Sequence, residues 1–191
     1  MMQQVLTAAT ALVVALFLLP ASRAASGEAA LWRVLASGDH VVVMRHAIAP
    51  GTGDPPDLRI GDCSTQRNLS QAGRDQAARI GALMRKHGIA KARVYSSQWC
   101  RAMETATLLD LGPVTELPAL DSFFSRGDGQ AQDRTLRGWI AKQDLTRPLV
   151  LVTHQVNVTA LSGLYPESGE MVVMRRDAGG KLSKVGSLKA E

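Results

Sequence analysis

The chain has 191 residues, 46% of them hydrophobic and 20% charged, which is typical of one folded globular domain and excludes a disordered protein. Its formal net charge of +5 comes from Lys and Arg residues that are scattered without a run of five or more. This distribution argues against a nucleic-acid-binding arm or a polybasic membrane patch, and it suits a small anionic substrate better.

An export signal is predicted at the N-terminus. The chain is almost wholly apolar from Val5 to Leu19, and after Pro20 come the small residues that a signal peptidase accepts. We therefore expect a signal peptide over residues 1–24, removed after Ala24, export to the periplasm, and no stable membrane insertion of the mature chain. The alternative is a retained membrane anchor, for which a run of about 15 apolar residues is short.

The rest of the chain alternates between helical and strand patterns. The expected elements are, in order, a short helix before the turn at 37–39, a buried strand at 41–44, a helix from 70 to 88, a strand at 93–96, a helix from 97 to 109, a helix at 131–142, a strand at 149–152 and a hairpin turning at 177–180. Ser70 and Ser97 are expected to cap the helices that follow them, and Gly88 to end the first of these.

Strands that alternate with helices predict an α/β fold. We expect a three-layer α/β/α sandwich with a mainly parallel sheet, to which the last hairpin adds an antiparallel edge. No repeat or linker follows the leader, so one domain is expected over residues 27–191. The long segment 47–68 is rich in Gly, Pro and Asp, and a structureless stretch of this length is usually functional.

Two of the apolar strands end in a histidine. The strand at 41–44 is followed by Arg45 and His46, and the strand at 149–152 by Thr153 and His154. In open α/β sheets, ligands bind beyond the carboxyl ends of the strands, so both imidazoles are expected in one crevice. A third strand delivers Arg101 on the first turn of its helix, where free backbone N–H groups also favour an anion.

These residue types together indicate phosphate chemistry. A single histidine is more often structural, and a single arginine at a helix start is usually a solvated charge. Two guanidinium groups suited to bidentate contacts, with two imidazoles, match the equatorial oxygens of a transferring phosphoryl group. The sequence therefore predicts a pocket for a small phosphorylated substrate.

Several motifs resemble the histidine phosphatase (phosphoglycerate mutase-like) superfamily, branch 1, over residues 40 to 162. They are Arg45-His46-Ala47 after a strand, Ser96-Ser97 with Arg101 and Glu104-Thr105-Ala106, and the late Thr153-His154. The resemblance implies a phosphoglycerate mutase-like fold and a phosphoric monoester hydrolase that needs no metal or other cofactor. It also implies that His46 is the nucleophile and that Arg45, Arg101 and His154 form the phosphate pocket.

Further motifs are similar to exported bacterial members related to lipopolysaccharide heptose phosphatases. These motifs are Gly61-Asp62-Cys63, Gln66-Arg67-Asn68-Leu69-Ser70, Ser97-Gln98-Trp99-Cys100-Arg101 and Thr153-His154-Gln155-Val156-Asn157. This similarity implies sugar or lipopolysaccharide phosphates as substrates.

Nucleophilic catalysis by an imidazole has structural requirements. A neutral ring nitrogen attacks phosphorus in line and forms a phosphohistidine that water then cleaves. His46 must therefore be unprotonated at that nitrogen, with its other N–H held by an acceptor, commonly a backbone carbonyl. His154, preferably protonated, is expected to stabilise the developing charge with the arginines.

The proton donor to the leaving group is expected in the segment between the second arginine and the late histidine. Asp121 lies there beside two aromatic residues, which would raise its pKa by desolvation. The alternative is that Asp121 starts a turn or caps a helix. Glu116 is a poorer candidate, and Glu104 is expected to stay on its helix as support. No Glu stands in the longer motif of the mutases, which argues against mutase activity.

Some residues around the pocket have two interpretations. Arg67 either reaches the phosphate or braces the long loop, and we favour bracing. Phe123, Phe124 and the Gly-rich segment 126–129 are expected to form a cover that selects the substrate. Trp99 either belongs to this site or packs beneath it.

The two cysteines, Cys63 and Cys100, either form a disulfide, as an even count in an exported protein allows, or remain separate thiols. Two other functions stay open. One is a non-catalytic phospho-ligand-binding protein, and the other is a phosphohistidine-protein phosphatase, whose imidazole leaving group needs little help from an acid.

Overall fold

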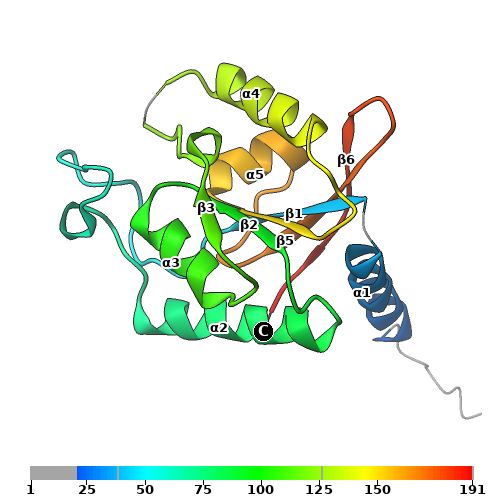
Figure 1. Cartoon of the computed structure of the whole chain (residues 1–191). Coiled ribbons are helices and arrows are strands. Elements are labelled where there is room, and N and C mark those ends of the chain that lie inside the picture. The colour runs from blue at the N-terminus through cyan, green and yellow to red at the C-terminus, as the bar shows by residue number, and fades with distance from the viewer. Residues whose placement is uncertain (1–20, 38, 126, 191) are drawn as a thin grey trace, which may run out of the picture.

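A six-stranded sheet forms the centre of the computed structural model, which describes residues 21–37, 39–125 and 127–190 (Figure 1). The strands are β1 (His40–Arg45), β2 (Arg93–Ser96), β3 (Val114–Glu116), β4 (Leu149–Thr153), β5 (Met171–Arg176) and β6 (Leu182–Leu188). Their order is β3-β2-β4-β1-β5-β6. The first four run parallel, whereas β5 is antiparallel to β1 and β6 to β5. The predicted parallel sheet with an antiparallel hairpin at its edge is confirmed.

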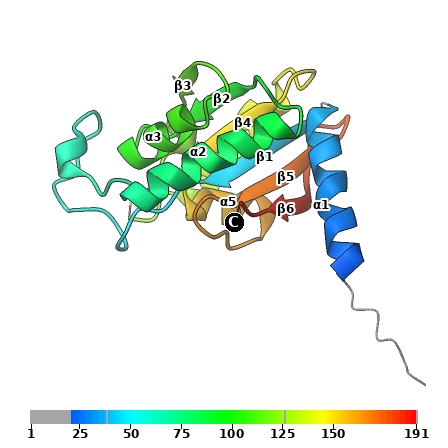
Figure 2. The same ribbon diagram turned by 90° about the horizontal axis from the view of Figure 1, so that it is seen from below.

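Helices cover both faces of this sheet. They are α1 (Ala21–Ala36), α2 (Gln71–Lys86), α3 (Cys100–Leu108), α4 (Gly129–Ala141) and α5 (Gln155–Ser162), with short 3-10 helices η1 (Cys63–Thr65) and η2 (Pro118–Leu120). α4 and α5 lie on one face, and α1, α2 and α3 on the other (Figures 1 and 2). Each face has its own apolar core, so the predicted three-layer α/β/α sandwich is confirmed.

The central strands are buried on both sides. In β1, Val42 and Met44 contribute to the core under α2 and α3, while Val41 and Val43 contribute to the core under α4 and α5. A strand covered on both faces needs apolar residues at every position, which explains its continuous rather than alternating apolar run.

The predicted boundaries of α2 are confirmed. Ser70 Oγ accepts a hydrogen bond from Gly73 N at 3.1 Å, as an N-cap does. Gly88 adopts φ +87°, and the N–H of Ile89 reaches the carbonyl of Met84 at 2.9 Å, which closes the helix in the expected left-handed turn.

Other elements differ from the sequence-based expectation. α3 begins at Cys100 with Trp99 at the N-cap position, so Ser97 does not cap it. Strand β3 and helix α5 were not predicted. The apolar part of the predicted leader lies outside the described residues, and the expected cleavage after Ala24 falls within α1. Within the residues that the structure describes, no helix has the length and apolar character needed to cross a membrane.

Candidate active site

Parallel strand ends bring the predicted residues to one edge of the sheet. Arg45 of β1 pairs in register with Thr153 of β4, so His46 and His154 follow at the same level. The N–H of His46 donates to the carbonyl of Thr153 at 2.8 Å, and the two imidazole centroids are 5.4 Å apart. The inference from strand order therefore correctly placed both histidines in one crevice.

His46 has the hydrogen bonds that a nucleophilic imidazole requires. Its Nδ1 lies 2.8 Å from the carbonyl oxygen of Ala47, so Nδ1 carries the hydrogen and the lone pair is on Nε2. Nε2 in turn accepts a hydrogen bond from Arg101 Nε at 3.2 Å. Burial, and then the positive charge of Arg101, lower the pKa of His46 well below its usual value. The imidazole is therefore neutral, and its unprotonated nitrogen faces the pocket cations.

Arg101 uses two edges of its guanidinium group. Along one edge, Nε donates to His46 and Nη2 approaches His154 Nδ1 at 3.3 Å. Along the other edge, Nη1 and Nη2 bind both carboxylate oxygens of Asp54 at 2.5 and 3.2 Å. The side chains of Arg101 and Asp54 are 2% and 17% exposed, so this ion pair is largely shielded from water.

His154 is held from behind by a serine. Its Nε2 lies 2.8 Å from Ser97 Oγ, and this hydroxyl donates to Asp121 Oδ1 at 3.0 Å. His154 therefore carries its hydrogen on Nε2 and presents Nδ1 to Arg101. Burial, followed by repulsion from His46 and Arg101, lowers the pKa of His154 well below its usual value. The lowered pKa indicates a neutral ring, whereas a protonated His154 is expected for stabilising the charge that develops during transfer.

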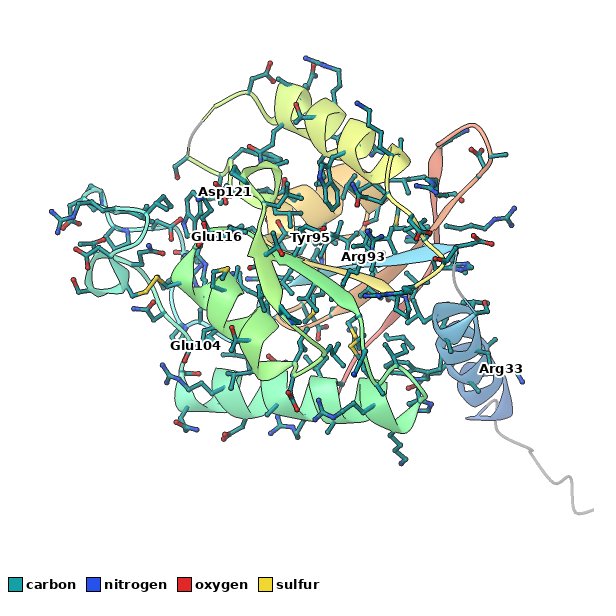
Figure 3. The ribbon with its side chains drawn as sticks, viewed as in Figure 1. Arg33, Arg93, Tyr95, Glu104, Glu116 and Asp121 are labelled. Atoms are coloured by element: carbon teal, nitrogen blue, oxygen red, sulfur yellow. A yellow bond between two sulfur atoms is a disulfide. The ribbon has the colours of Figure 1, made fainter. Side chains whose placement is uncertain are left out.

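Asp121 does not line the pocket, and Ser97 lies between it and His154. Besides Ser97, its Oδ1 accepts the backbone N–H of Gln98 at 2.8 Å. Desolvation raises the pKa of Asp121, as expected, and these two hydrogen bonds oppose the increase. Figure 3 shows Asp121 beside Glu116, on the side of the molecule from which the long loop projects. Its carboxylate supports the turn before α3 and the Ser97–His154 pair.

The long loop is fastened to α3 at several points. A disulfide joins Cys63 to Cys100, seen in Figure 3 where the loop meets this helix. Gln66 Oε1 accepts the N–H of Cys100 at 3.0 Å, so this first N–H of α3 is not left free for an anion, contrary to our expectation. Arg67 donates to the carbonyls of Gly53, at 2.9 Å, and Ala49. Arg67 therefore braces the loop, as favoured from the sequence, while it also lines the pocket.

The pocket has a volume of about 150 Å³ and is bordered by charged, polar and aromatic residues. Its lining consists of Arg45, His46, Gly51, Thr52, Gly53, Asp54, Arg67, Arg101, Ser122, Phe124, His154, Gln155, Val156 and Tyr165. Arg45 Nη1 donates to the carbonyl of Pro166 at 3.1 Å, while its buried Nε has no partner among the described residues. The arginines thus leave the pocket positively charged and suited to a phosphoryl group.

The expected cover is divided between two places. Phe124 and Tyr165 line the pocket and remain 65% and 72% exposed. Phe123 instead borders a separate hollow beside the start of α4, which Asp128 caps by accepting the N–H groups of Gln130 and Ala131. Arg126 of the Gly-rich segment lies outside the described residues.

Sequence reasoning missed three residues of this site: Asp54, Ser97 and Tyr165. Ser97 was interpreted as a helix cap, and its role beside His154 follows only from the order of β2 and β4 in the sheet. For Asp54 the only signal was its place in a long Gly-rich loop. Trp99 is buried and donates from Nε1 to Asp54 Oδ2 at 3.1 Å, so it both packs in the core and contacts the site. In the part of the chain that the structure describes, no three His, Cys, Asp or Glu residues are grouped to hold a metal ion.

Comparison with protein families identifies the superfamily of this chain. The model of the histidine phosphatase superfamily (branch 1) matches residues 41–142, more than half of the chain and the part that contains β1, the long loop and α3. The chain belongs to this superfamily. The predicted enzyme class, a phosphatase, is confirmed by this membership. No curated protein matches the sequence of this histidine phosphatase at a significant level.

Solved structures share the fold of this histidine phosphatase. The protein histidine phosphatase SixA complexed with tungstate is 18% identical, with a TM-score of 0.57 over 78% of this chain and 96% of that chain. A mycobacterial glucosyl-3-phosphoglycerate phosphatase with inorganic phosphate is 17% identical, with a TM-score of 0.56 over 76% and 94% of the two chains. Mycobacterial hydrolase 1 is 16% identical, with a TM-score of 0.59 over 77% and 95%. At these identities the similarity shows the fold.

Proposed function

We propose that this histidine phosphatase hydrolyses phosphomonoesters through a phosphohistidine intermediate on His46. The observation that carries the proposal is the state of this imidazole. Nδ1 is hydrogen-bonded to the Ala47 carbonyl, and burial keeps the ring neutral. Nε2 faces the edge of Arg101 that is formed by Nε and Nη2, which we call its inner edge. Family membership favours catalysis over the alternative of a non-catalytic phospho-ligand-binding protein.

Two displacements at phosphorus make up the proposed reaction. In the first, the lone pair of His46 Nε2 forms the N–P bond, the ester P–O bond breaks, and its electron pair leaves on the alcohol oxygen, which takes up a proton. In the second, a water oxygen attacks phosphorus, the N–P bond breaks, and its electron pair returns to Nε2. Water gives up one proton, and inorganic phosphate is released.

The cations of the pocket stabilise the transferring group. The inner edge of Arg101 lies between the two histidines, where the equatorial oxygens of the phosphoryl group would sit. Arg45 and Arg67 border the same space and contribute positive charge. Arg67 acts mainly through the loop that it braces, because its guanidinium group already binds two backbone carbonyls.

His154 is the proposed carrier of the proton for the leaving oxygen. Burial and then repulsion from nearby charges lower the pKa of His154, and a bound phosphoryl dianion would offset this repulsion and favour a proton on Nδ1. Nε2–H then stays on Ser97, and the negative charge of Asp121 behind this hydroxyl stabilises the imidazolium. In this proposal Asp121 is a positioning residue. The sequence had suggested instead that Asp121 donates the proton directly.

Hydrolysis of phosphohistidine is a second candidate function. Among the described residues that line the pocket, Asp54 is the one carboxylate, and it is bound by Arg101 and Trp99. Among these lining residues no carboxylic acid is thus free to protonate an alkoxide, which leaves this task to His154, whereas an imidazole leaving group needs little protonation. The proposed export of the chain makes this candidate weaker, because phosphorelay proteins are cytoplasmic.

We further propose that the enzyme is exported to the periplasm and acts on sugar or lipopolysaccharide phosphates. The Cys63–Cys100 disulfide supports export, because disulfides form and persist in oxidising compartments. The substrate proposal depends on the similarity of the loop and Trp99-Cys100-Arg101 motifs to exported heptose phosphatase relatives.

Phosphate release and phosphoenzyme trapping test the proposed function. The purified chain is expected to release phosphate from p-nitrophenyl phosphate and from a sugar phosphate equally well with and without a chelator. Labelled substrate, quenched in alkali, is expected to label the wild type and His87→Asn but not His46→Asn. Loss of turnover on chelation, or a label that persists in His46→Asn, contradicts the mechanism. Faster release from phosphohistidine than from any ester favours the second candidate.

A further inference from the structure

We infer that Asp54 is a positioning residue that sets the orientation of Arg101 for phosphoryl transfer. The inference rests on the proposed function, since it assigns a role within the same pocket. Asp54 lies in the long loop, eight residues after His46, and lines the pocket beside Arg101.

The contacts divide the guanidinium group into two edges with different partners. Nε and Nη2 point to the nitrogen atoms of His46 and His154, at 3.2 and 3.3 Å. Nη1 and the remaining N–H of Nη2 point to the two oxygens of Asp54. A bidentate carboxylate fixes both the plane and the rotation of a guanidinium group. Asp54 therefore directs the free edge into the space between the histidines.

The surroundings hold Asp54 itself in place. Its Oδ2 also accepts the indole N–H of Trp99, a residue that is 4% exposed. Its neighbour Gly53 is bound through its carbonyl by Arg67, and the disulfide ties the rest of the loop to α3. The carboxylate is therefore set by the fold before any substrate arrives, which is what an orienting group requires.

A competing interpretation is that Asp54 imitates the phosphoryl group and must leave Arg101 before substrate binds. The two interpretations predict opposite effects of removing the carboxylate. Loss of a competitor would strengthen the binding of oxyanions, whereas loss of an orienting partner weakens the binding of the transition state. The contacts favour orientation, because Asp54 binds the outer edge of Arg101 and the histidines mark the inner one.

The experiment compares Asp54→Asn with Asp57→Asn, which removes the same charge from an exposed position of the same loop. The substrate is p-nitrophenyl phosphate, and the inhibitors are vanadate, which imitates the five-coordinate transition state, and inorganic phosphate. We expect kcat/KM of Asp54→Asn to fall by about 10- to 100-fold and the Ki of vanadate to rise by a similar factor. The Ki of phosphate changes less, and Asp57→Asn behaves as the wild type.

Inhibition constants do not depend on the fraction of active enzyme, so partial misfolding does not imitate the expected result. Vanadate that binds Asp54→Asn as tightly as the wild type, or more tightly, overturns the inference. If Asp54→Asn does not fold, Trp99→Phe is tested instead, because it removes one donor to the same carboxylate. A smaller loss of vanadate affinity is then expected, and an unchanged affinity overturns the inference. A wild type that forms no phosphoenzyme refutes the proposed function instead.

Discussion

Acidification is expected to destabilise this protein through its two pocket histidines. In the folded state the pKa values of His46 and His154 are lowered, mainly by burial, whereas an unfolded histidine titrates near 6.5. Below that pH the unfolded chain binds two protons that the folded chain does not, so stability is fully present above pH 6.5 and is lost as the pH falls. The slope is about 1.4 kcal/mol per pH unit for each histidine. Between pH 7 and pH 5 the free energy of unfolding therefore falls by up to about 4 kcal/mol.

Urea unfolding followed by tryptophan fluorescence in phosphate-free buffer at several pH values measures this slope. The double variant His46→Asn/His154→Gln is expected to show a flatter dependence than the wild type, whereas Val185→Ala, at an exposed site on β6 without a titratable side chain, retains the wild-type slope. Asp121 acts in the opposite direction, because its raised pKa lets the folded state keep a proton that the unfolded state has already lost. Equal slopes for the wild type and the double variant between pH 7 and pH 5 would refute the reasoning.

Three further results are expected. Replacing both cysteines by serine removes a crosslink between residues 37 apart and lowers the free energy of unfolding by about 2–4 kcal/mol. This would be contradicted if the wild type had the same midpoint of unfolding with and without reductant. Phe124→Ala and Tyr165→Ala each raise KM for p-nitrophenyl phosphate by about 3- to 10-fold through lost ring contacts, while the Ki of inorganic phosphate for these two variants stays unchanged. The control variant Val185→Ala, at an exposed site on β6, keeps wild-type activity. Phosphate binding at pH 8 takes up a proton on His154, seen as a binding enthalpy that depends on the buffer in the wild type but not in His154→Gln.

The layers of the fold followed from the sequence because they depend on local patterns. Val41 to Met44 are apolar at every position, which identifies a strand covered on both faces, and Ser70 and Gly88 mark the ends of a helix by their own chemistry. Strand β3 has only three residues, at the sheet edge, and leaves too short a pattern to detect. The placement of His46 and His154 needed only the rule that parallel strand ends meet at one edge.

Contacts made across loops did not follow from the sequence. Asp54 meets Arg101 because the path of the long loop is set by the disulfide and by Arg67, and no local pattern encodes that path. Asp121 was correctly placed near the site, but Ser97 stands between it and His154. The lowered pKa of His154 did not follow from the sequence either, since it depends on burial and on charged groups from three separate segments.

The charges of the pocket explain why neutral histidines and a bound carboxylate belong together. Burial in a small pocket, and then repulsion by the three arginines that border it, lower the pKa of both imidazoles, so both rings stay neutral. In the proposed mechanism, neutrality leaves His46 Nε2 unprotonated for attack, but it also leaves His154 without the proton that a leaving oxygen needs. A phosphoryl dianion changes this balance, because its charge offsets the arginines and raises the proton affinity of His154. Asp54 binds Arg101 on the edge that faces away from the histidines, and the inferred orienting role lets the pocket attract the dianion without losing the orientation of Arg101. In the proposed mechanism the substrate's own charge is then what converts His154 from a neutral ring into an acid.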